Sequence, residues 1–234
     1  MNNDELQEHF ATQAFKQGLR SETNSPRAVK IRSMFKRYLP GGTILDVGCA
    51  DGALLAPISK QYRIIGVDVS TPMMELALKN GYSEIITASL EAGLPFGNDA
   101  FDGVFCGETL EHVVDTDFAL CELNRVLKPG GVLVVTVPNV RTIFSLIRWF
   151  LNDPPMFGAR YRSGHVRDFT TKHIRVALRN NGFETVKLVG SDFYPISMLN
   201  GLATFLPSFA TTVIAVAHQK QKMDYQKRDN TSIE

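Results

Sequence analysis

A glycine-containing turn rich in acidic residues is the feature of this sequence best suited to chemistry. Asp46 lies in a short apolar run, residues 43–47, and the turn 48–52 follows directly. A glycine turn at the carboxyl end of a strand lets a ligand approach the backbone closely, in the crevice where α/β sheets bind ligands. Asp68 ends the next β-branched run, 22 residues after Asp46. A carboxylate at that place accepts hydrogen bonds from ribose hydroxyls, so the pattern indicates a nucleoside ligand.

The charge of this turn indicates which kind of nucleoside would bind. Dinucleotide sites place a pyrophosphate at a helix N-terminus that is lined with small residues. Here Asp51 lies in the turn and Asp46 precedes it, and two carboxylates would repel a pyrophosphate. They suit a ligand that has no phosphate and one positively charged end. S-adenosylmethionine fits that description.

A second group of reactive side chains follows the apolar run 101–106. On a helical turn Glu108, Glu111 and His112 would share one face, and carboxylates together with imidazole can bind a divalent cation. His165 would be a further ligand, 53 residues after His112. That site needs both a helical turn here and a loop that delivers His165. We therefore expect no metal, and we expect His112 to be the catalytic residue, as a base or as part of the pocket wall.

Signals for strands and helices alternate along the chain and indicate how these side chains are positioned. Apolar runs predict strands, and amphipathic stretches bounded by Pro, Gly or capping residues predict helices. Such alternation is typical of a parallel sheet with helices on both faces. Strands are expected at 43–47, 63–69, 84–88, 101–106, 132–137, 183–189 and 211–217, and helices at 53–61, 71–80, 115–127, 140–151 and 171–181.

Five short motifs between residues 40 and 140 match a known pattern. They are LDVGCADG (45–52), GVDVS (66–70), LPF (94–96), FDGVF (101–105) and LKPGG (127–131). In this order they resemble class I S-adenosylmethionine-dependent methyltransferases of domain type 11/23, similar to the ubiquinone-pathway O-methyltransferases. The resemblance implies a Rossmann-like seven-stranded sheet of order 3-2-1-4-5-7-6, with strand 7 antiparallel, helices on both faces and a small cap. It also implies an enzyme whose cofactor is S-adenosyl-L-methionine.

The resemblance further implies which residues hold the cofactor. The turn would line its methionine part, Asp68 would bind the ribose, and Val69 and Met73 would pack on the adenine. Many relatives carry an acid after strand three; this chain has Ser89 there, whose hydroxyl would bond the adenine amino group, with Leu90 beside it. The expected cofactor-binding residues are therefore Asp46, Gly48, Cys49, Ala50, Gly52, Asp68, Val69, Met73, Ser89 and Leu90.

The composition is typical of one globular α/β domain. The chain has 234 residues, of which 44% are apolar and 21% charged, with three cysteines, and this excludes a disulfide scaffold or a collagen-like fibre. No apolar run reaches the roughly 18 residues that a membrane span needs, and the first residues do not read as a signal peptide, so a cytoplasmic location is expected. We expect one domain over 1–218, with a helical arm at 1–39, a cap or lid at 141–180 and a polar tail at 219–234.

Charge is distributed unevenly, and this bears on the methyl acceptor. Residues 40–140 contain 13 acidic and 5 basic residues, whereas residues 141–187 contain 9 basic and 3 acidic. The basic block, which includes Arg160 and Arg162, is either a solvated face or a surface for an acidic partner. We expect O- or C-methylation of a small-molecule acceptor, acidic or phenolic.

Other interpretations stay open. An RNA methyltransferase is an alternative, although the net charge of +1 argues against nucleic acid. A non-catalytic sensor of S-adenosylmethionine or S-adenosylhomocysteine is another. The apolar stretch 143–151 is a substrate lid, a membrane-facing patch, a dimer contact or a helix packed on the sheet.

Overall fold

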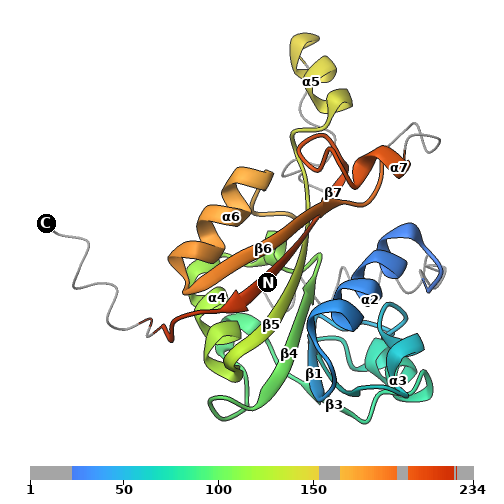
Figure 1. Ribbon diagram of the computed structural model, residues 1–234, viewed down its shortest axis with the longest axis vertical. Helices are drawn as coiled ribbons and strands as arrows, with labels where there is room; N and C mark the ends of the chain where they lie inside the picture. Colours follow the sequence, from blue (N-terminus) through green and yellow to red (C-terminus); the bar gives the residue numbers. More distant parts are fainter. Residues whose placement is uncertain (1–22, 153–163, 194–199, 224, 226–234) are drawn as a thin grey trace, which may run out of the picture.

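One mixed seven-stranded sheet organises the computed structural model, which describes residues 23–152, 164–193, 200–223 and 225 (Figure 1). The strand order is β3-β2-β1-β4-β5-β7-β6. β7 runs antiparallel to both of its neighbours, and the other strand pairs are parallel. This confirms the expected sheet and strand order. The strands are β1 (Thr43–Val47), β2 (Arg63–Asp68), β3 (Glu84–Thr87), β4 (Phe101–Gly107), β5 (Leu127–Pro138), β6 (Phe183–Gly190) and β7 (Thr212–Gln219).

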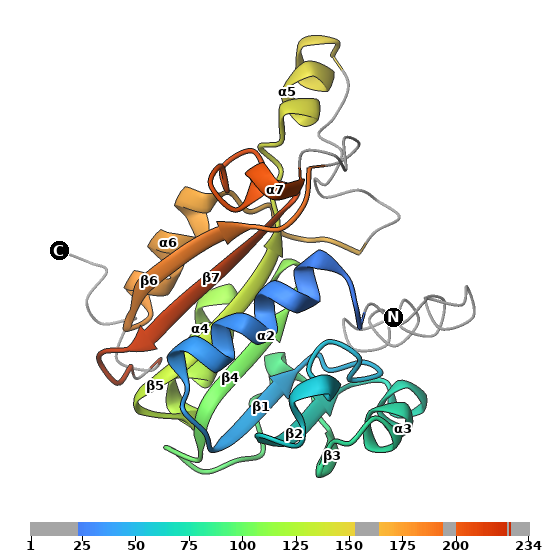
Figure 2. The same ribbon diagram turned by 45° about the vertical axis from the view of Figure 1, so that its right-hand side comes forward.

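Helices cover both faces of the sheet, as Figures 1 and 2 show. The helices of the described residues are α2 (Pro26–Tyr38), α3 (Thr71–Lys79), α4 (Thr116–Val126), α5 (Ile143–Phe150), α6 (Thr171–Asn180) and the short α7 (Asn200–Ala203). Three 3-10 turns, η1 (Ala56–Ile58), η2 (Leu90–Ala92) and η3 (Leu110–His112), lie between them. Local capping signals set several of these boundaries. At the start of α4, for example, the side chain of the N-cap residue Asp115 accepts a hydrogen bond from the N–H of Phe118.

The alternation of side chains along β1 divides the core between the two faces. Leu45 belongs to the core cluster that includes residues of α4 and α6, whereas Ile44 belongs to the cluster that includes residues of α2 and α3. Successive strand residues point to opposite faces, and both faces of β1 are buried, so its residues after Thr43 are apolar except for Asp46. That exception places a carboxylate inside the protein, at the end of the strand.

One expected helix differs from the structure. The helix expected at 53–61 is wrong, since only the 3-10 turn η1 forms there. Pro57 has no amide hydrogen to donate and disfavours the helical conformation of Ala56, so a longer helix does not propagate. α2 lies within the expected helical arm: Ser25 caps it by accepting the N–H of Ala28 at 3.1 Å, and Pro26 occupies its first turn. Residues 1–22 of the expected arm lie outside the described residues.

α5 points away from the sheet in both views (Figures 1 and 2). Trp149 is 66% exposed and Phe150 80% exposed, so these side chains do not pack on the sheet. The interpretation of residues 143–151 as a helix packed on the sheet is therefore wrong for Trp149 and Phe150. Within the described part of the chain, none of the helices combines the length and the apolar character needed to cross a bilayer.

Candidate active site

Three segments meet at the carboxyl ends of the central strands. β1 lies between β2 and β4, with Val47 in register with Val67 on one side and Cys106 on the other. The turn after β1, Asp68 at the end of β2 and the 3-10 turn η3 after β4 are therefore neighbours. This is the edge at which parallel α/β sheets bind their ligands.

The turn after β1 is a tight loop with glycine at two positions where the backbone is left-handed. Gly48 and Gly52 have φ of +74° and +69°, the left-handed region that side chains disfavour. The N–H groups of Gly48 and Cys49 both donate to the carbonyl of Val67, at 2.8 and 3.1 Å. A Cβ at Gly48 would lie 2.3 Å from the Thr109 hydroxyl, so the missing side chain lets the segment after β4 lie directly against the turn.

Asp68 is held in place by the backbone on both sides of it. The Ala50 N–H donates to Oδ2 and the Ser70 N–H donates to Oδ1, each at 2.9 Å. Burial raises the pKa of this carboxyl, and the backbone donors counteract that rise. Each oxygen has a further lone pair, so the carboxylate can still accept hydrogen bonds from a ligand.

Asp46 is the buried acid of the site, at 2% exposure. The hydroxyl of Tyr82 donates to its Oδ2, while its Oδ1 is buried without a hydrogen-bond partner among the described residues. Burial raises the pKa of Asp46 to about 7. A positively charged ligand group would supply the missing partner, so the site fits a cationic nucleoside such as S-adenosylmethionine. The sequence pattern did not point to Tyr82, which lies 36 residues from Asp46.

The remaining expected cofactor residues surround this centre. Cys49 is buried, with its Sγ 2.7 Å from where a Cβ of Gly66 would lie, so the thiol packs against β2. Met73 is buried in the first turn of α3, which follows Val69. Ser89 caps η2 by accepting the N–H of Glu91 at 3.3 Å, and Leu90 is part of the core.

Ser89 and Leu90 follow Ala88, whose N–H donates to the Asp68 carbonyl at 3.1 Å, so both lie near the end of β2. The structure thus brings the turn, Asp68 and the η2 segment together. The contacts that Val69, Met73, Ser89 and Leu90 would make with the cofactor stay predictions.

A cluster of acidic and imidazole groups lies beside this centre, on η3 and the loop before α6. Glu111, His112 and His165 each offer a ligand atom within 4.8 Å of those of the other two. Glu111 is 1% exposed, and its Oε2 has no hydrogen-bond partner among the described residues. Burial, and then the charge of Glu108, raise the pKa of Glu111 well above its usual range.

Glu108 belongs to the same segment and pairs with a residue of α2. Its backbone has a left-handed φ of +51°, and its Oε2 lies 3.4 Å from Nη1 of Arg27, a residue of α2. The structure does not group Glu108 with the three ligand atoms. Sequence reasoning missed Arg27, although Ser25 and Pro26 signal the helix that carries it.

The loop that carries His165 is fastened to η3 by backbone hydrogen bonds. The carbonyl of Glu111 accepts from the N–H groups of Val166 and Arg167, at 2.8 and 3.1 Å. Nδ1 of His112 lies 3.1 Å from the carbonyl of Gly164, and since a carbonyl only accepts, Nδ1 carries the hydrogen. The two imidazole rings are 4.9 Å apart. Burial lowers the pKa of His112, which favours a neutral imidazole with its lone pair on Nε2.

The basic block is only partly covered by the structure. Arg160 and Arg162 lie outside the described residues. Arg167 is directed at the segment after η3, where its guanidinium donates to the carbonyl of Val114. The expectation that the block binds an acidic acceptor stays a prediction.

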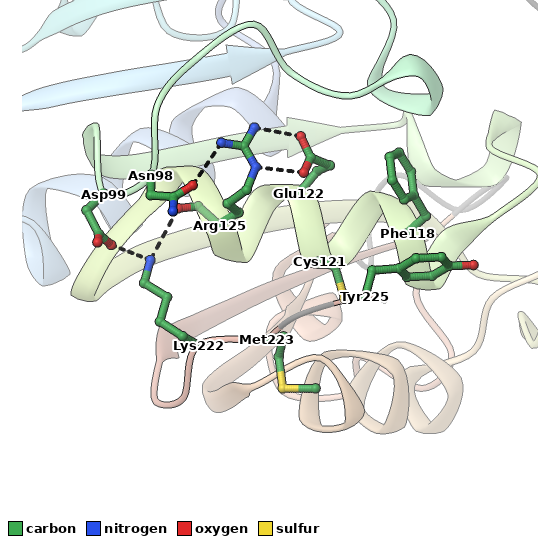
Figure 3. Close-up of a pocket in the computed structure, with 9 residues that line it drawn as sticks. All are labelled: Asn98, Asp99, Phe118, Cys121, Glu122, Arg125, Lys222, Met223 and Tyr225. Atoms are coloured by element: carbon green, nitrogen blue, oxygen red, sulfur yellow. Dashed lines mark hydrogen bonds and ion pairs between the residues drawn. The ribbon is translucent and has the colours of Figure 1, made fainter. Parts of the chain in front are cut away.

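A pocket of about 470 Å³ lies elsewhere, between α4 and the C-terminal segment (Figure 3). Its charged side chains pair with one another: Arg125 Nε lies 2.7 Å from Glu122 Oε1, and Lys222 pairs with Asp99. It is lined by Asn98, Asp99, Phe118, Cys121, Glu122, Arg125, Lys222, Met223 and Tyr225. None of the expected site residues lines it, so it is not the candidate site.

Known proteins share the pattern of this chain. Residues 45–135 match the family described as "Methyltransferase domain". A demethylmenaquinone methyltransferase of Symbiobacterium thermophilum is 38% identical over 104 residues, which are 40% of this chain and 41% of that protein. An uncharacterised protein of Methanocaldococcus jannaschii is 29% identical over 82% of this chain and 81% of its own length. The human "Probable tRNA methyltransferase 9B" is 29% identical over 50% of this chain and 26% of its own length.

Solved structures share the fold. A SAM-dependent methyltransferase of Thermotoga maritima superposes with a TM-score of 0.66 at 22% identity, over 89% of this chain and 96% of that one. The cyclase SpnF superposes with a TM-score of 0.61 at 20% identity, over 82% of this chain and 81% of that one. The sheet order, the acidic glycine turn and Asp68 are thus found together in a fold that methyltransferases use.

Proposed function

We propose that this chain, which carries a class I methyltransferase domain with S-adenosylmethionine as cofactor, methylates a small-molecule acceptor at oxygen or carbon. The observation that carries the proposal is the close approach of Thr109 to Gly48, where an added Cβ would lie 2.3 Å from the Thr109 hydroxyl. It puts the expected donor site against the segment of η3, where a buried acid and two imidazoles converge. An acceptor placed at that cluster would lie next to the donor.

The donor would be held by the turn and by Asp68. Asp68 would accept hydrogen bonds from the ribose hydroxyls, with its position set by the Ala50 and Ser70 N–H groups. Asp46 would face the positively charged methionine part, since its Oδ1 is buried without a partner in the described structure. Val69, Met73, Ser89 and Leu90 would surround the adenine.

The chain has little covalent chemistry to perform, because the sulfonium of the bound cofactor supplies an already activated methyl group. The residues around it align donor and acceptor and exclude water. We assign the catalytic role to His112. Its Nδ1–H is directed at Gly164, so Nε2 is the atom that would accept a proton from an acceptor hydroxyl.

A second function is favoured by one comparison, the similarity to a protein named as a tRNA methyltransferase. That similarity covers 26% of the relative, and the formal net charge of this chain is only +1, so a small acceptor is the better proposal. Phenolic or acidic acceptors are favoured by the basic block at 141–187. We place this activity in the cytoplasm.

The deciding experiment supplies the full chain with S-adenosylmethionine labelled in its methyl group. Phenols, quinols, carboxylic acids and total tRNA are offered as acceptors in separate reactions, and label is followed into each. Transfer to a phenol or quinol supports the proposal. Transfer to tRNA alone would replace it with the second function, and donor binding without transfer to any acceptor would favour a sensor.

A further inference from the structure

Exposed apolar side chains gather on two short segments of the chain. Of the fifteen large apolar side chains that are exposed among the described residues, nine lie on α5 with the residue after it, or on α7 with the turn after it. Large apolar groups left in water together mark a surface that another molecule or a membrane covers. The nine are Ile143, Leu146, Ile147, Trp149, Phe150, Leu151, Leu202, Phe205 and Leu206.

The two segments are joined at the base of α5. Nδ2 of Asn139 donates to the carbonyls of Ser208 and Ala210, at 3.1 and 2.8 Å. The guanidinium of Arg141 lies over the ring of Phe209, 6.0 Å from its centroid. Figures 1 and 2 both place α5 and α7 at one end of the molecule, with α3 at the other. We call the nine side chains at this end the apolar tip.

The shape of the apolar tip favours a lipid surface over a flat protein surface. Between residues 143 and 151 only Ser145 and Arg148 are not apolar, and Ser145 is buried, where its hydroxyl accepts from that of Thr142 at 2.8 Å. Apolar side chains therefore project from α5 on several sides. A flat partner would cover one of those sides, whereas the acyl chains of a membrane surround whatever enters them.

The charge near the apolar tip favours an anionic lipid surface. Residues 139–152 contain Arg141 and Arg148 and no acid, and residues 200–210 contain no charged side chain. Arginine is attracted to anionic phospholipid headgroups, while a second copy of this chain would bring like charges together. Trp and Phe are also side chains typical of helices that lie in the membrane interface.

We propose that the apolar tip inserts into the surface of a membrane that contains anionic phospholipid. α5 has eight residues and is about 12 Å long, against about 30 Å for the hydrocarbon core of a bilayer, so it enters one leaflet only. The long side chain of Arg148 reaches the headgroups while its neighbours lie in the acyl chains. This attachment goes beyond the proposed function and needs neither donor nor acceptor.

Trp149 reports on this insertion directly, because it is the only tryptophan of the chain and is 66% exposed. The full chain is mixed with vesicles of phosphatidylcholine alone, or with about 30% phosphatidylglycerol to supply negative charge. With the anionic vesicles we expect the emission of Trp149 to shift to the blue and brominated acyl chains to quench it. Binding, measured by vesicle sedimentation, should weaken about tenfold without the anionic lipid and also fall at high salt.

Variants that keep the reporter separate the apolar tip from the rest of the surface. Phe150→Ser combined with Leu151→Ser should weaken binding to anionic vesicles about a hundredfold, and Phe205→Ser about tenfold, since each apolar side chain removed from water contributes about tenfold. Leu78→Ser removes an exposed leucine of α3 at the other end and is the matched control. It should bind vesicles like the wild type.

Unchanged emission of Trp149 with anionic vesicles would overturn the proposal, as would equal vesicle binding by wild type and the Phe150→Ser, Leu151→Ser variant. Equal binding to both kinds of vesicle would contradict the role of the arginines. A blue shift that grows with protein concentration in the absence of vesicles, together with a doubled mass in sedimentation, would assign the apolar tip to a second copy instead. Calorimetry with S-adenosylmethionine tests the proposed function separately, since the donor site lies outside the apolar tip.

Discussion

The backbone N–H of Ala50 donates a 2.9 Å hydrogen bond to the side chain of Asp68. This bond joins the turn after β1 to the end of β2, so the shape of the turn and the position of the expected ribose ligand depend on each other. A change at Asp68 should therefore act on the donor site twice, through the lost carboxylate and through the released turn.

Asp68→Ala should lower the affinity for S-adenosylmethionine by about ten- to a hundredfold. It removes charge-assisted hydrogen bonds worth about 1.5–3 kcal/mol. The affinity of Asp68→Asn should lie between those of Asp68→Ala and the wild type, since asparagine keeps one acceptor oxygen. Calorimetry measures both, and unchanged binding by Asp68→Ala would contradict the ribose assignment. Tight NADH binding without S-adenosylmethionine binding would contradict the donor itself.

Donor binding should strengthen as the pH rises from about 6 to 8. The pKa of Asp46 is raised to about 7 by burial, and the cationic donor pairs with the ionised form, so binding at lower pH must release a proton. Asp46→Asn should remove this part of the pH dependence, and Tyr82→Phe should move it to higher pH, because the Tyr82 hydroxyl stabilises the carboxylate. Identical profiles in wild type and Asp46→Asn would show that another group titrates.

The same raised pKa predicts the sign of a stability effect. Asp46 holds its proton in the folded chain at pH values where the unfolded chain has lost it. The free energy of unfolding should therefore decrease between about pH 4 and 7 through this residue. Asp46→Asn should flatten that part of the stability profile, measured by urea denaturation.

Gly48→Ala should destabilise the chain by about 1–3 kcal/mol and weaken donor binding. The alanine has to adopt a φ of +74°, and its Cβ meets the Thr109 hydroxyl. Adding Thr109→Ala should recover part of the loss, because it removes the close contact but not the strained backbone. Gly97→Ala is the control, since nothing lies within 4 Å of the added Cβ. Equal thermal stability of Gly48→Ala and Gly97→Ala would argue against the close packing of the turn.

Reversing the charge of Arg160 and Arg162 by substitution with Glu should weaken the binding of an acidic acceptor, with little change in donor affinity. The prediction rests on the basic block of the sequence, and the attraction should fade with salt because charges beyond about 10 Å are screened at 0.1 M. Lys60→Glu, an exposed reversal outside the block, is the control. KM for the acceptor measures the effect, and insensitivity to both reversal and salt would refute it.

Local patterns made the central half of the molecule predictable. Each signal is local in the sequence: the apolar run at 43–47, the glycine turn and the acid that ends β2. Such local patterns predict the strand, the turn and the site directly. The helix at 53–61 failed because Pro57 outweighs the apolar spacing there. α5 forms within the helix expected at 140–151, but its position off the sheet was not predicted. An apolar stretch predicts a helix and not the surface on which that helix lies.

The sequence by itself therefore determined the order of elements, the class of fold and the acidic turn with Asp68. Only the tertiary structure paired Tyr82 with Asp46 and Arg27 with Glu108. It also brought His165 to Glu111 and His112, a grouping that the sequence offered only as an alternative. These partners are far apart in the chain and belong to different elements. Their meeting depends on how helices and loops pack on the sheet, and that packing is the sum of many long-range contacts that no local spacing encodes.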